Sequence, residues 1–315
     1  MLPLRSGHRQ RHGFRHLAIS ALAIAQSKQE PVTVPSDGLA LSGVVHLPAD
    51  IKAHEKRPAV LILHGFGGHK DGPQQRWSSN QFAAWGYVAL RLDYRGCGDS
   101  EGKRGWVLPM EQVADTRNAM TYLAGRADVD PARICLVGTS YGASVAIWTA
   151  GIDERAKGVI AQGGWANGER KAREQHKTPE AWAKFSAMLE KGRAHKASSG
   201  ESLMVDRYDV VPVPDHLRAN IDARSIFQFP VDTPIETFAF NPEEVIAKVA
   251  PRPILLMHAA NDRVTPVNGA VELFQASKQP CELYLMSDVD HFMFGEDNPR
   301  VIRLVKDWLD RYFPV

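Results

Sequence analysis

The feature that most constrains the fold is a serine placed between an apolar run and a run of small residues. The segment "RICLVGTSYGASVAI" (133–147) joins a run typical of a buried strand to residues that can begin a helix, through a Gly-x-Ser-x-Gly turn. Ser140 is then either a nucleophile held up at a sharp strand-to-helix turn or part of a tight corner that needs only its glycines. Because the pattern also arises by chance, its surroundings must decide.

Strands and helices are predicted to alternate along most of the chain. Continuous apolar runs such as "RPAVLILHGFGG" and "YVALRLDYRG" indicate strands covered on both faces, and residues 76–85, 109–125, 267–277 and 299–313 have helical patterns. This alternation predicts a mainly parallel sheet with helices on both faces. The first two strands, in "VTVPSDGLALSGVVHLP", lack a helix between them and are expected to form an antiparallel edge.

Residues 165–245 interrupt the rhythm of strands and helices. Thr178 and Pro179 are typical of a helix start, and the prolines at 212, 214, 230 and 234 indicate irregular structure beyond that helix. So long an interruption between core strands predicts an inserted, mostly helical cap over the carboxyl edge of the sheet, where ligands bind in such folds. The predicted domains are a core of residues 32–164 and 246–315, the cap insertion 165–245, and an N-terminal extension, 1–31.

The N-terminal extension allows two interpretations. Residues 1–26 are rich in Arg and His, have no acidic residue and contain a short apolar stretch, 17–25. Such a segment is either a disordered extension, including an over-long start, or a targeting segment. We expect a cytoplasmic protein, with export as the alternative if residues 1–25 act as a signal peptide.

Composition limits the classes of partner. The net charge of +2 and the lack of basic clusters with aromatic residues argue against nucleic acid, and no apolar run is long enough to span a membrane. The three cysteines, Cys97, Cys135 and Cys281, have no spacing typical of a zinc site or a disulfide framework. We expect a small-molecule ester or amide substrate, no metal and no organic cofactor. The sequence makes no prediction of oligomeric state.

A serine hydroxyl needs a base and a group that orients the base, and the chain offers both after the two following core strands. Asp262 in "HAANDRVTP" is either a turn residue or the orienting acid, and His291 in "SDVDHFMF" is either structural or the base. Asp288 and Asp290 are rivals for the acid but lie in the loop of the histidine itself. The order Ser140, Asp262, His291 favours a catalytic triad.

A glycine-rich loop two strands before Ser140 is suited to stabilising an oxyanion. In "LHGFGG", glycines let backbone N–H groups approach a ligand, and the expected donors are the backbone N–H groups of Phe66 and Tyr141. A phosphate-binding loop is the rival interpretation, but "GFGGHKDG" lacks the Gly-Lys-Ser/Thr ending. Ser100 in "RGCGDSEG" follows no strand-to-helix turn and is predicted to belong to a structured loop near the site.

These motifs resemble those of α/β-hydrolase fold proteins over roughly residues 32–315. "DYRGCGDSEG" with "GTSYG" is similar to the branch that contains dienelactone hydrolase-like proteins, Xaa-Pro dipeptidyl peptidases and related acyl esterases. The resemblance implies an α/β-hydrolase fold, a triad of Ser140, Asp262 and His291, and oxyanion positions at Phe66 and Tyr141. Dienelactone hydrolases proper carry a cysteine at the turn, and many peptidases of the group have a second glycine where this chain has Ala143.

The sequence therefore predicts a serine hydrolase that cleaves a small carboxylic ester through an acyl-enzyme. Peptide cleavage is less favoured, because the chain has no room for the extra domains that restrict such peptidases to peptides. Amidase, peptidase, lactonase or carbamate hydrolase activity at the same triad is the alternative. A non-catalytic, ligand-binding member of the fold is a second alternative.

Overall fold

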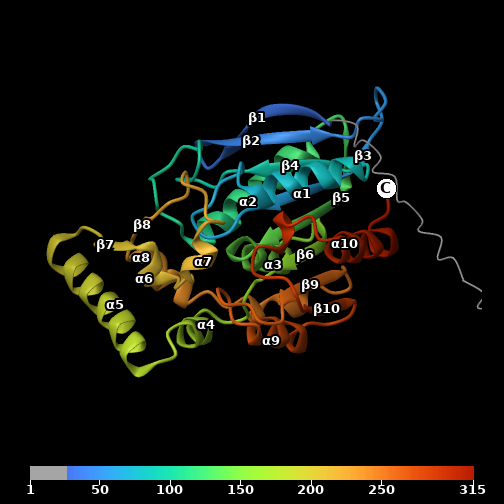
Figure 1. Ribbon diagram of the computed structural model, residues 1–315. Coiled ribbons are helices and arrows are strands. Elements are labelled where there is room, and N and C mark those ends of the chain that lie inside the picture. The colour runs from blue at the N-terminus through green and yellow to red at the C-terminus, as the bar shows by residue number, and fades with distance from the viewer. Residues whose placement is uncertain (1–26) are drawn as a thin grey trace, which may run out of the picture.

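The protein is built around one sheet whose parallel central strands have their carboxyl ends at the same edge (Figure 1). The computed structural model describes residues 27–315, so the targeting segment or signal peptide considered above lies outside the described residues. Eight strands form one sheet in the order β1-β2-β4-β3-β5-β6-β9-β10. They are β1 (Lys28–Ser36), β2 (Leu39–Leu47), β3 (Arg57–Leu63), β4 (Val88–Leu92), β5 (Val129–Thr139), β6 (Ala156–Gln162), β9 (Ile254–Ala259) and β10 (Cys281–Met286).

The direction of the strands agrees with the sequence prediction. β1 pairs antiparallel with β2, and β2 pairs antiparallel with β4, whereas β4, β3, β5, β6, β9 and β10 run parallel. Asp37 and Gly38 both have positive φ, at 49° and 84°. This is the conformation of the two-residue turn whose twist matches that of paired antiparallel strands, and it explains why β1 and β2 form a hairpin without a helix.

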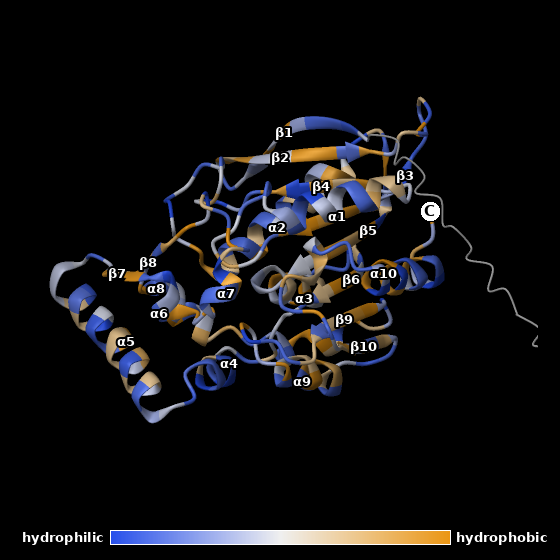
Figure 2. Ribbon diagram, in the orientation of Figure 1, coloured by the Kyte–Doolittle hydropathy of each residue, from blue (hydrophilic) through white to orange (hydrophobic). Residues whose placement is uncertain are grey.

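Helices cover both faces of the sheet because successive strand residues point to opposite sides. In β3, Leu61 and Leu63 belong to one buried cluster and Val60 and Ile62 to the other. The first cluster lies beneath α2 (Pro109–Ala124), α3 (Tyr141–Ile152) and α9 (Asn268–Ala276), and the second beneath α1 (Pro73–Ala84) and α10 (Pro299–Tyr312). Figure 2 shows the hydrophobic strands enclosed between these helices. The predicted fold class is confirmed.

The chain between β6 and β9 forms a separate, mostly helical group at one side of the molecule (Figure 1). We call residues 165–245 the insertion. Thr178 caps α5 by accepting a hydrogen bond from the Ala181 N–H at 3.2 Å, with Pro179 at the first helical position, as the sequence predicted. The elements of the insertion are α4 (Gly168–Gln175), α5 (Pro179–Ser199), β7 (Met204–Asp206), α6 (Arg207–Val210), α7 (Asp215–Arg218), β8 (Gln228–Pro230), α8 (Asp232–Phe238) and the 3-10 turn Pro242–Glu244.

Within the insertion, a short strand pair and buried side chains hold the elements together. β7 and β8 pair antiparallel in a two-stranded sheet apart from the main one. In α5, Phe185 and Leu189 are buried, and the Phe185 ring stacks on His176. Phe185 and Leu189 therefore pack within the fold. Two further 3-10 turns, Ile246–Lys248 and Met293–Gly295, follow the insertion in the core.

Candidate active site

Ser140 lies at a strained turn between β5 and α3. Its φ of 55° and ψ of −118° lie in a region that residues with a side chain rarely adopt. A Cβ at Gly138 would lie 2.2 Å from the Gly142 carbonyl oxygen, and one at Gly142 would lie 2.5 Å from the Leu63 carbonyl oxygen. Both glycines are therefore required by the close approach of α3 to β5 and β3, and the turn leaves the serine side chain half-buried at the end of the strand.

His291 and Asp262 form a direct pair next to this turn. Asp262 follows β9 and His291 follows β10, and the His291 Nδ1–H donates to the Asp262 Oδ2 at 2.7 Å. The other carboxylate oxygen, Oδ1, accepts from the backbone N–H groups of Val264 and Thr265, each at 2.8 Å. Burial alone would raise the pKa of Asp262, but the adjacent His291 and these hydrogen bonds outweigh it, so the pKa lies below its usual value.

Three further residues fix this pair, and the sequence analysis did not single them out. His258 lies with its Nε2 3.4 Å from the Asp262 Oδ2 and 2.9 Å from the Thr265 carbonyl oxygen. The Gln162 side chain donates to the His291 carbonyl oxygen at 3.1 Å. Gly163 has a φ of 69°, and a Cβ there would lie 3.1 Å from the His291 Cε1. Their only sequence signal is position, because Gln162 ends β6, Gly163 follows it, and His258 is the residue before the last of β9.

Ser140 and His291 line the same cavity, of about 140 Å³. No hydrogen bond joins the Ser140 hydroxyl to the His291 ring within residues 27–315. Asp288 and Asp290, the rival acids, make no ion pair with His291 in this part of the chain. The core lines the cavity with the loop after β3, with Val264 and with the loop after β10, and the insertion contributes Arg207, Val211, Val213, Asn220, Ile221, Asp222 and Ser225.

The two residues predicted to supply oxyanion donors belong to segments that border the Ser140 turn. Phe66 lines the cavity, and Tyr141 is the first residue of α3. Within the described residues, neither N–H donates a hydrogen bond to another protein group. A Cβ at Gly65 would lie 3.3 Å from the Ser140 Cβ, which shows how closely the loop after β3 approaches the serine. Two unused donors beside a serine form an arrangement suited to a developing negative charge.

The cavity also contains a carboxyl group with a shifted pKa. Burial and the nearby Asp290 carboxylate raise the pKa of Glu296 to about 7. The insertion supplies Arg207, which is buried, to the same cavity. The wall of the cavity therefore carries a cation and a carboxyl group whose pKa lies near neutral pH.

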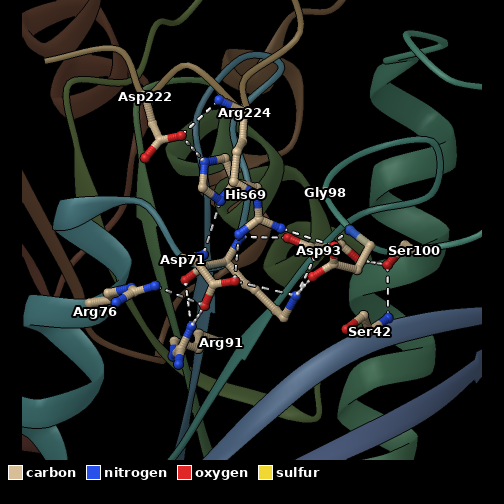
Figure 3. Close-up of polar contacts among 12 residues, drawn as sticks. Ser42, His69, Asp71, Arg76, Arg91, Asp93, Gly98, Ser100, Asp222 and Arg224 are labelled. Carbon is tan, nitrogen blue, oxygen red and sulfur yellow. Dashed lines mark hydrogen bonds and ion pairs between the residues drawn. The ribbon is translucent and has the colours of Figure 1, made fainter. Parts of the chain in front are cut away.

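An ion-pair network supports the loops around the cavity (Figure 3). Asp93, which follows β4 and is fully buried, accepts from the Lys70 ammonium at 2.8 Å and from the Asp99 N–H at 2.9 Å. Arg224 of the insertion binds Asp71 at 3.1 Å and Asp99 at 2.9 Å. Ser100 donates to the Asp93 carbonyl oxygen at 2.8 Å, so "RGCGDSEG" forms a structured loop, as predicted.

Residues 27–315 form neither a metal-binding cluster nor a membrane-spanning helix. No group of three or more His, Cys, Asp or Glu side chains is placed to hold a metal ion. No helix in this range is long and apolar enough to cross a lipid bilayer.

Comparison with known proteins agrees with this architecture. An uncharacterized 31.7 kDa protein of Escherichia coli is 27% identical over 88% of this chain and 97% of its own length. The acyltransferase drtE of Aspergillus calidoustus is 28% identical over 78% of this chain and 83% of its own.

Solved structures with the same fold cover nearly the whole chain. The crystal structure of the hypothetical protein PA2218 from Pseudomonas aeruginosa superposes with a TM-score of 0.78 at 20% identity, over 92% of this chain and 95% of its own. Est1E from Butyrivibrio proteoclasticus, solved with bound ferulic acid, superposes with a TM-score of 0.64 at 18% identity, over 89% and 98%. At these identities the likeness concerns the fold.

Residues 54–298 match the Hydrolase_4 family, described as serine aminopeptidase, S33. That range contains the strained serine turn, the Asp262–His291 pair and the whole insertion. The chain therefore belongs to the Hydrolase_4 family and is an α/β-hydrolase fold hydrolase.

Proposed function

We propose that the protein hydrolyses small carboxylic esters with Ser140 as nucleophile, His291 as general base and Asp262 as the acid that orients the base. The observation that carries this proposal is the strained Ser140 turn, which opens into the same cavity as a histidine held by a buried carboxylate. A residue held in an unfavourable backbone conformation lowers the stability of the fold, and such strain is concentrated at functional sites.

The proposed reaction has two steps. The Ser140 Oγ attacks the ester carbonyl carbon while the His291 Nε2 takes its proton, and the carbonyl oxygen becomes an oxyanion facing the N–H groups of Phe66 and Tyr141. Collapse breaks the bond to the alcohol, which leaves with the proton from His291. Water then attacks the acyl-enzyme by the same route, releasing the acid and restoring Ser140.

The geometry of the pair supports these roles. Asp262 accepts from the His291 Nδ1, which leaves the Nε2 as the nitrogen that can accept a proton. The hydrogen bond from serine to base often forms only when substrate binds, so its absence in the free protein is compatible with the proposal. The insertion lines one wall of the cavity, and we propose that it acts as the cap that selects the substrate.

Amide hydrolysis is the second candidate, because the matched family is described as serine aminopeptidase. The same triad cleaves amides, and the carboxyl of Glu296 in the cavity wall could pair with a free amino group of a substrate. Hydrolysis of lactones or carbamates would use the same triad and would require no further catalytic residue.

The test is hydrolysis by the full chain of p-nitrophenyl acetate, butyrate and octanoate, beside alanine p-nitroanilide. We expect the acetate or butyrate to have the highest kcat/KM, because the cavity is small. Ser140→Ala should lower kcat by about four orders of magnitude or more while the circular dichroism spectrum is unchanged. Preference for the anilide would establish the amidase, and full activity of Ser140→Ala would contradict the proposal.

A further inference from the structure

Arg207 is a buried cation at the boundary between the insertion and the proposed oxyanion loop. It is the first residue of α6, and its side chain lines the cavity that contains Ser140. Its Nη2 donates to the Phe66 carbonyl oxygen at 2.6 Å, and its Nη1 donates to the Ile226 carbonyl oxygen at 2.8 Å. Within the described residues no carboxylate forms an ion pair with it. Burial lowers the pKa of Arg207 to about 10, which leaves it charged at neutral pH.

The loop that carries the Phe66 N–H is held from two sides. On the core side, the Gly65 carbonyl oxygen accepts from the Gly68 N–H at 3.0 Å and from the His64 Nδ1–H at 2.9 Å. On the insertion side, Arg207 binds the Phe66 carbonyl, and the Ile226 N–H donates to the Gly67 carbonyl oxygen at 2.8 Å. The Phe66 N–H belongs to the Gly65–Phe66 peptide group, which the core holds, and the insertion holds the two peptide groups that follow it.

Aromatic contacts hold the same loop. The Phe66 ring stacks on Phe229 of β8 with centroids 4.2 Å apart, and the Arg207 guanidinium lies 5.5 Å from the Phe66 centroid. Gly67 has a φ of 54°, and a Cβ there would lie 2.6 Å from the Phe229 ring. The loop therefore packs closely against the insertion, and any movement away from the insertion would break these contacts.

We propose that Arg207 is a positioning residue that holds the peptide group after the Phe66 N–H, and through the Phe66 main chain keeps that N–H directed at the oxyanion, so that the insertion completes the oxyanion hole. This inference rests on the proposed function. An oxyanion donor is effective only when it lies 2.7–3.1 Å from the developing charge, and loss of one donor typically lowers kcat by about 10²- to 10³-fold. Loss of the Arg207 contacts would leave the donor present but misplaced, so a smaller loss is expected.

The test compares Arg207→Met and Arg207→Lys in the full chain, with Arg224→Met as the matched control. Arg224 also joins the insertion to the core, but through Asp71 and Asp99 rather than through the oxyanion loop. The substrates are p-nitrophenyl butyrate, which is neutral, and mono-p-nitrophenyl glutarate, whose acyl group carries a carboxylate. A trifluoromethyl ketone, whose adduct with serine places an oxyanion in the hole, serves as inhibitor.

We expect Arg207→Met to lower kcat for both esters by about 10- to 100-fold with little change in KM. The affinity for the trifluoromethyl ketone should fall by a similar factor. Arg207→Lys keeps the charge but reaches only one carbonyl, so its kcat should lie between those of the wild type and of Arg207→Met. Arg224→Met should keep kcat within about twofold. Thermal unfolding of each variant verifies that the fold persists, and Arg207→Lys carries the test if Arg207→Met does not fold.

Three results would overturn the proposal. A loss confined to the glutarate ester would show that Arg207 binds the charge of a substrate rather than positioning the loop. An equal loss in Arg224→Met would show that any loosening of the insertion has the same effect. A rise in KM with unchanged kcat would assign Arg207 to substrate binding. An inactive wild-type protein would instead refute the proposed function. Because the wild type is assayed first, this failure is distinguished from a failure of the Arg207 proposal.

Discussion

At the scale of single residues, the site depends on backbone positions that few side chains can occupy. Ser140 is held at positive φ between two glycines, and Gly163 at positive φ lies against His291. Ser140 thus occupies a position that glycine would adopt with less strain. Retaining a serine there costs stability, and the proposed role of its hydroxyl gives a reason for that cost.

The strain at Ser140 can be measured directly. Ser140→Gly should unfold at a higher temperature than Ser140→Ala, by an amount corresponding to about 1 kcal/mol, because only glycine adopts this conformation without strain. Differential scanning calorimetry of the two inactive variants is the measurement. Equal or lower stability of the glycine variant would show that the turn stores no strain.

Gly163 provides a test of how tightly His291 is placed. Gly163→Ala should lower kcat by between about 10- and 100-fold, because the added methyl group would displace the imidazole. Gly38→Ala is the control, since Gly38 also has positive φ but has no atom within 4 Å of an added Cβ. It should lose stability and keep kcat. Steady-state kinetics of the two variants distinguish displacement of His291 from backbone strain alone. Equal kcat values would show that a methyl group at Gly163 does not displace His291.

At the scale of elements, charged groups connect the loops that border the cavity. Asp93 at the end of β4 binds the loop before α1 through Lys70 and the loop before α2 through the Asp99 N–H (Figure 3). Gly98 has positive φ and a Cβ there would collide with the Asp93 carboxylate. This explains the glycine at that position of "RGCGDSEG". The insertion joins the network from outside, through Arg224.

Asp93 is buried and Arg224 is partly exposed, so the two residues should contribute differently to stability. Asp93→Ala should lower the free energy of unfolding by about 3 kcal/mol or more, because it removes the acceptor of the buried Lys70 N–H and of the Asp99 N–H and the buried carboxylate that pairs with the Lys70 ammonium. Arg224→Met should cost less than about 1 kcal/mol, since its ion pairs are partly solvated. Urea denaturation of both variants measures the difference. Equal costs would contradict this division of the network.

At the scale of the whole molecule, local patterns in the sequence predicted more than contacts between distant segments could. The continuous apolar runs of the strands, the Thr178 cap and the Gly-x-Ser-x-Gly turn at Ser140 are all local signals, and Asp262 and His291 were found by the strands that they follow. The hold of Arg207 on the Phe66 carbonyl joins residues 141 positions apart, and no local pattern marks it. Gln162 and His258 were missed for the same reason, since their contacts depend on the neighbours of β6 and β9 in the sheet.

Two buried histidines predict how stability depends on pH. Burial lowers the pKa of His64 and of His46 to about 4, and a neighbouring Arg91 also lowers that of His46. Between pH 6.5 and 4 the unfolded chain therefore binds more protons than the folded one, and stability falls as pH falls through this window. From pH 7 to pH 5 the loss for His64 is on the order of 2 kcal/mol.

Chemical denaturation at pH 7 and pH 5 tests this linkage. His64→Asn, whose side-chain amide can still donate to the Gly65 carbonyl without titrating, should lose less stability over this interval than the wild type. An identical pH dependence in the two proteins would show that His64 does not contribute.

The most direct measurement of the central claim is covalent labelling of the full chain by a fluorophosphonate, followed by intact mass and peptide mapping. The account predicts one phosphonyl group per chain, attached to Ser140, and no labelling of Ser140→Ala. Labelling should be slower in His291→Ala, because the base that activates the hydroxyl is gone. A folded wild-type protein that takes up no label, or a label on a residue other than Ser140, would contradict the account.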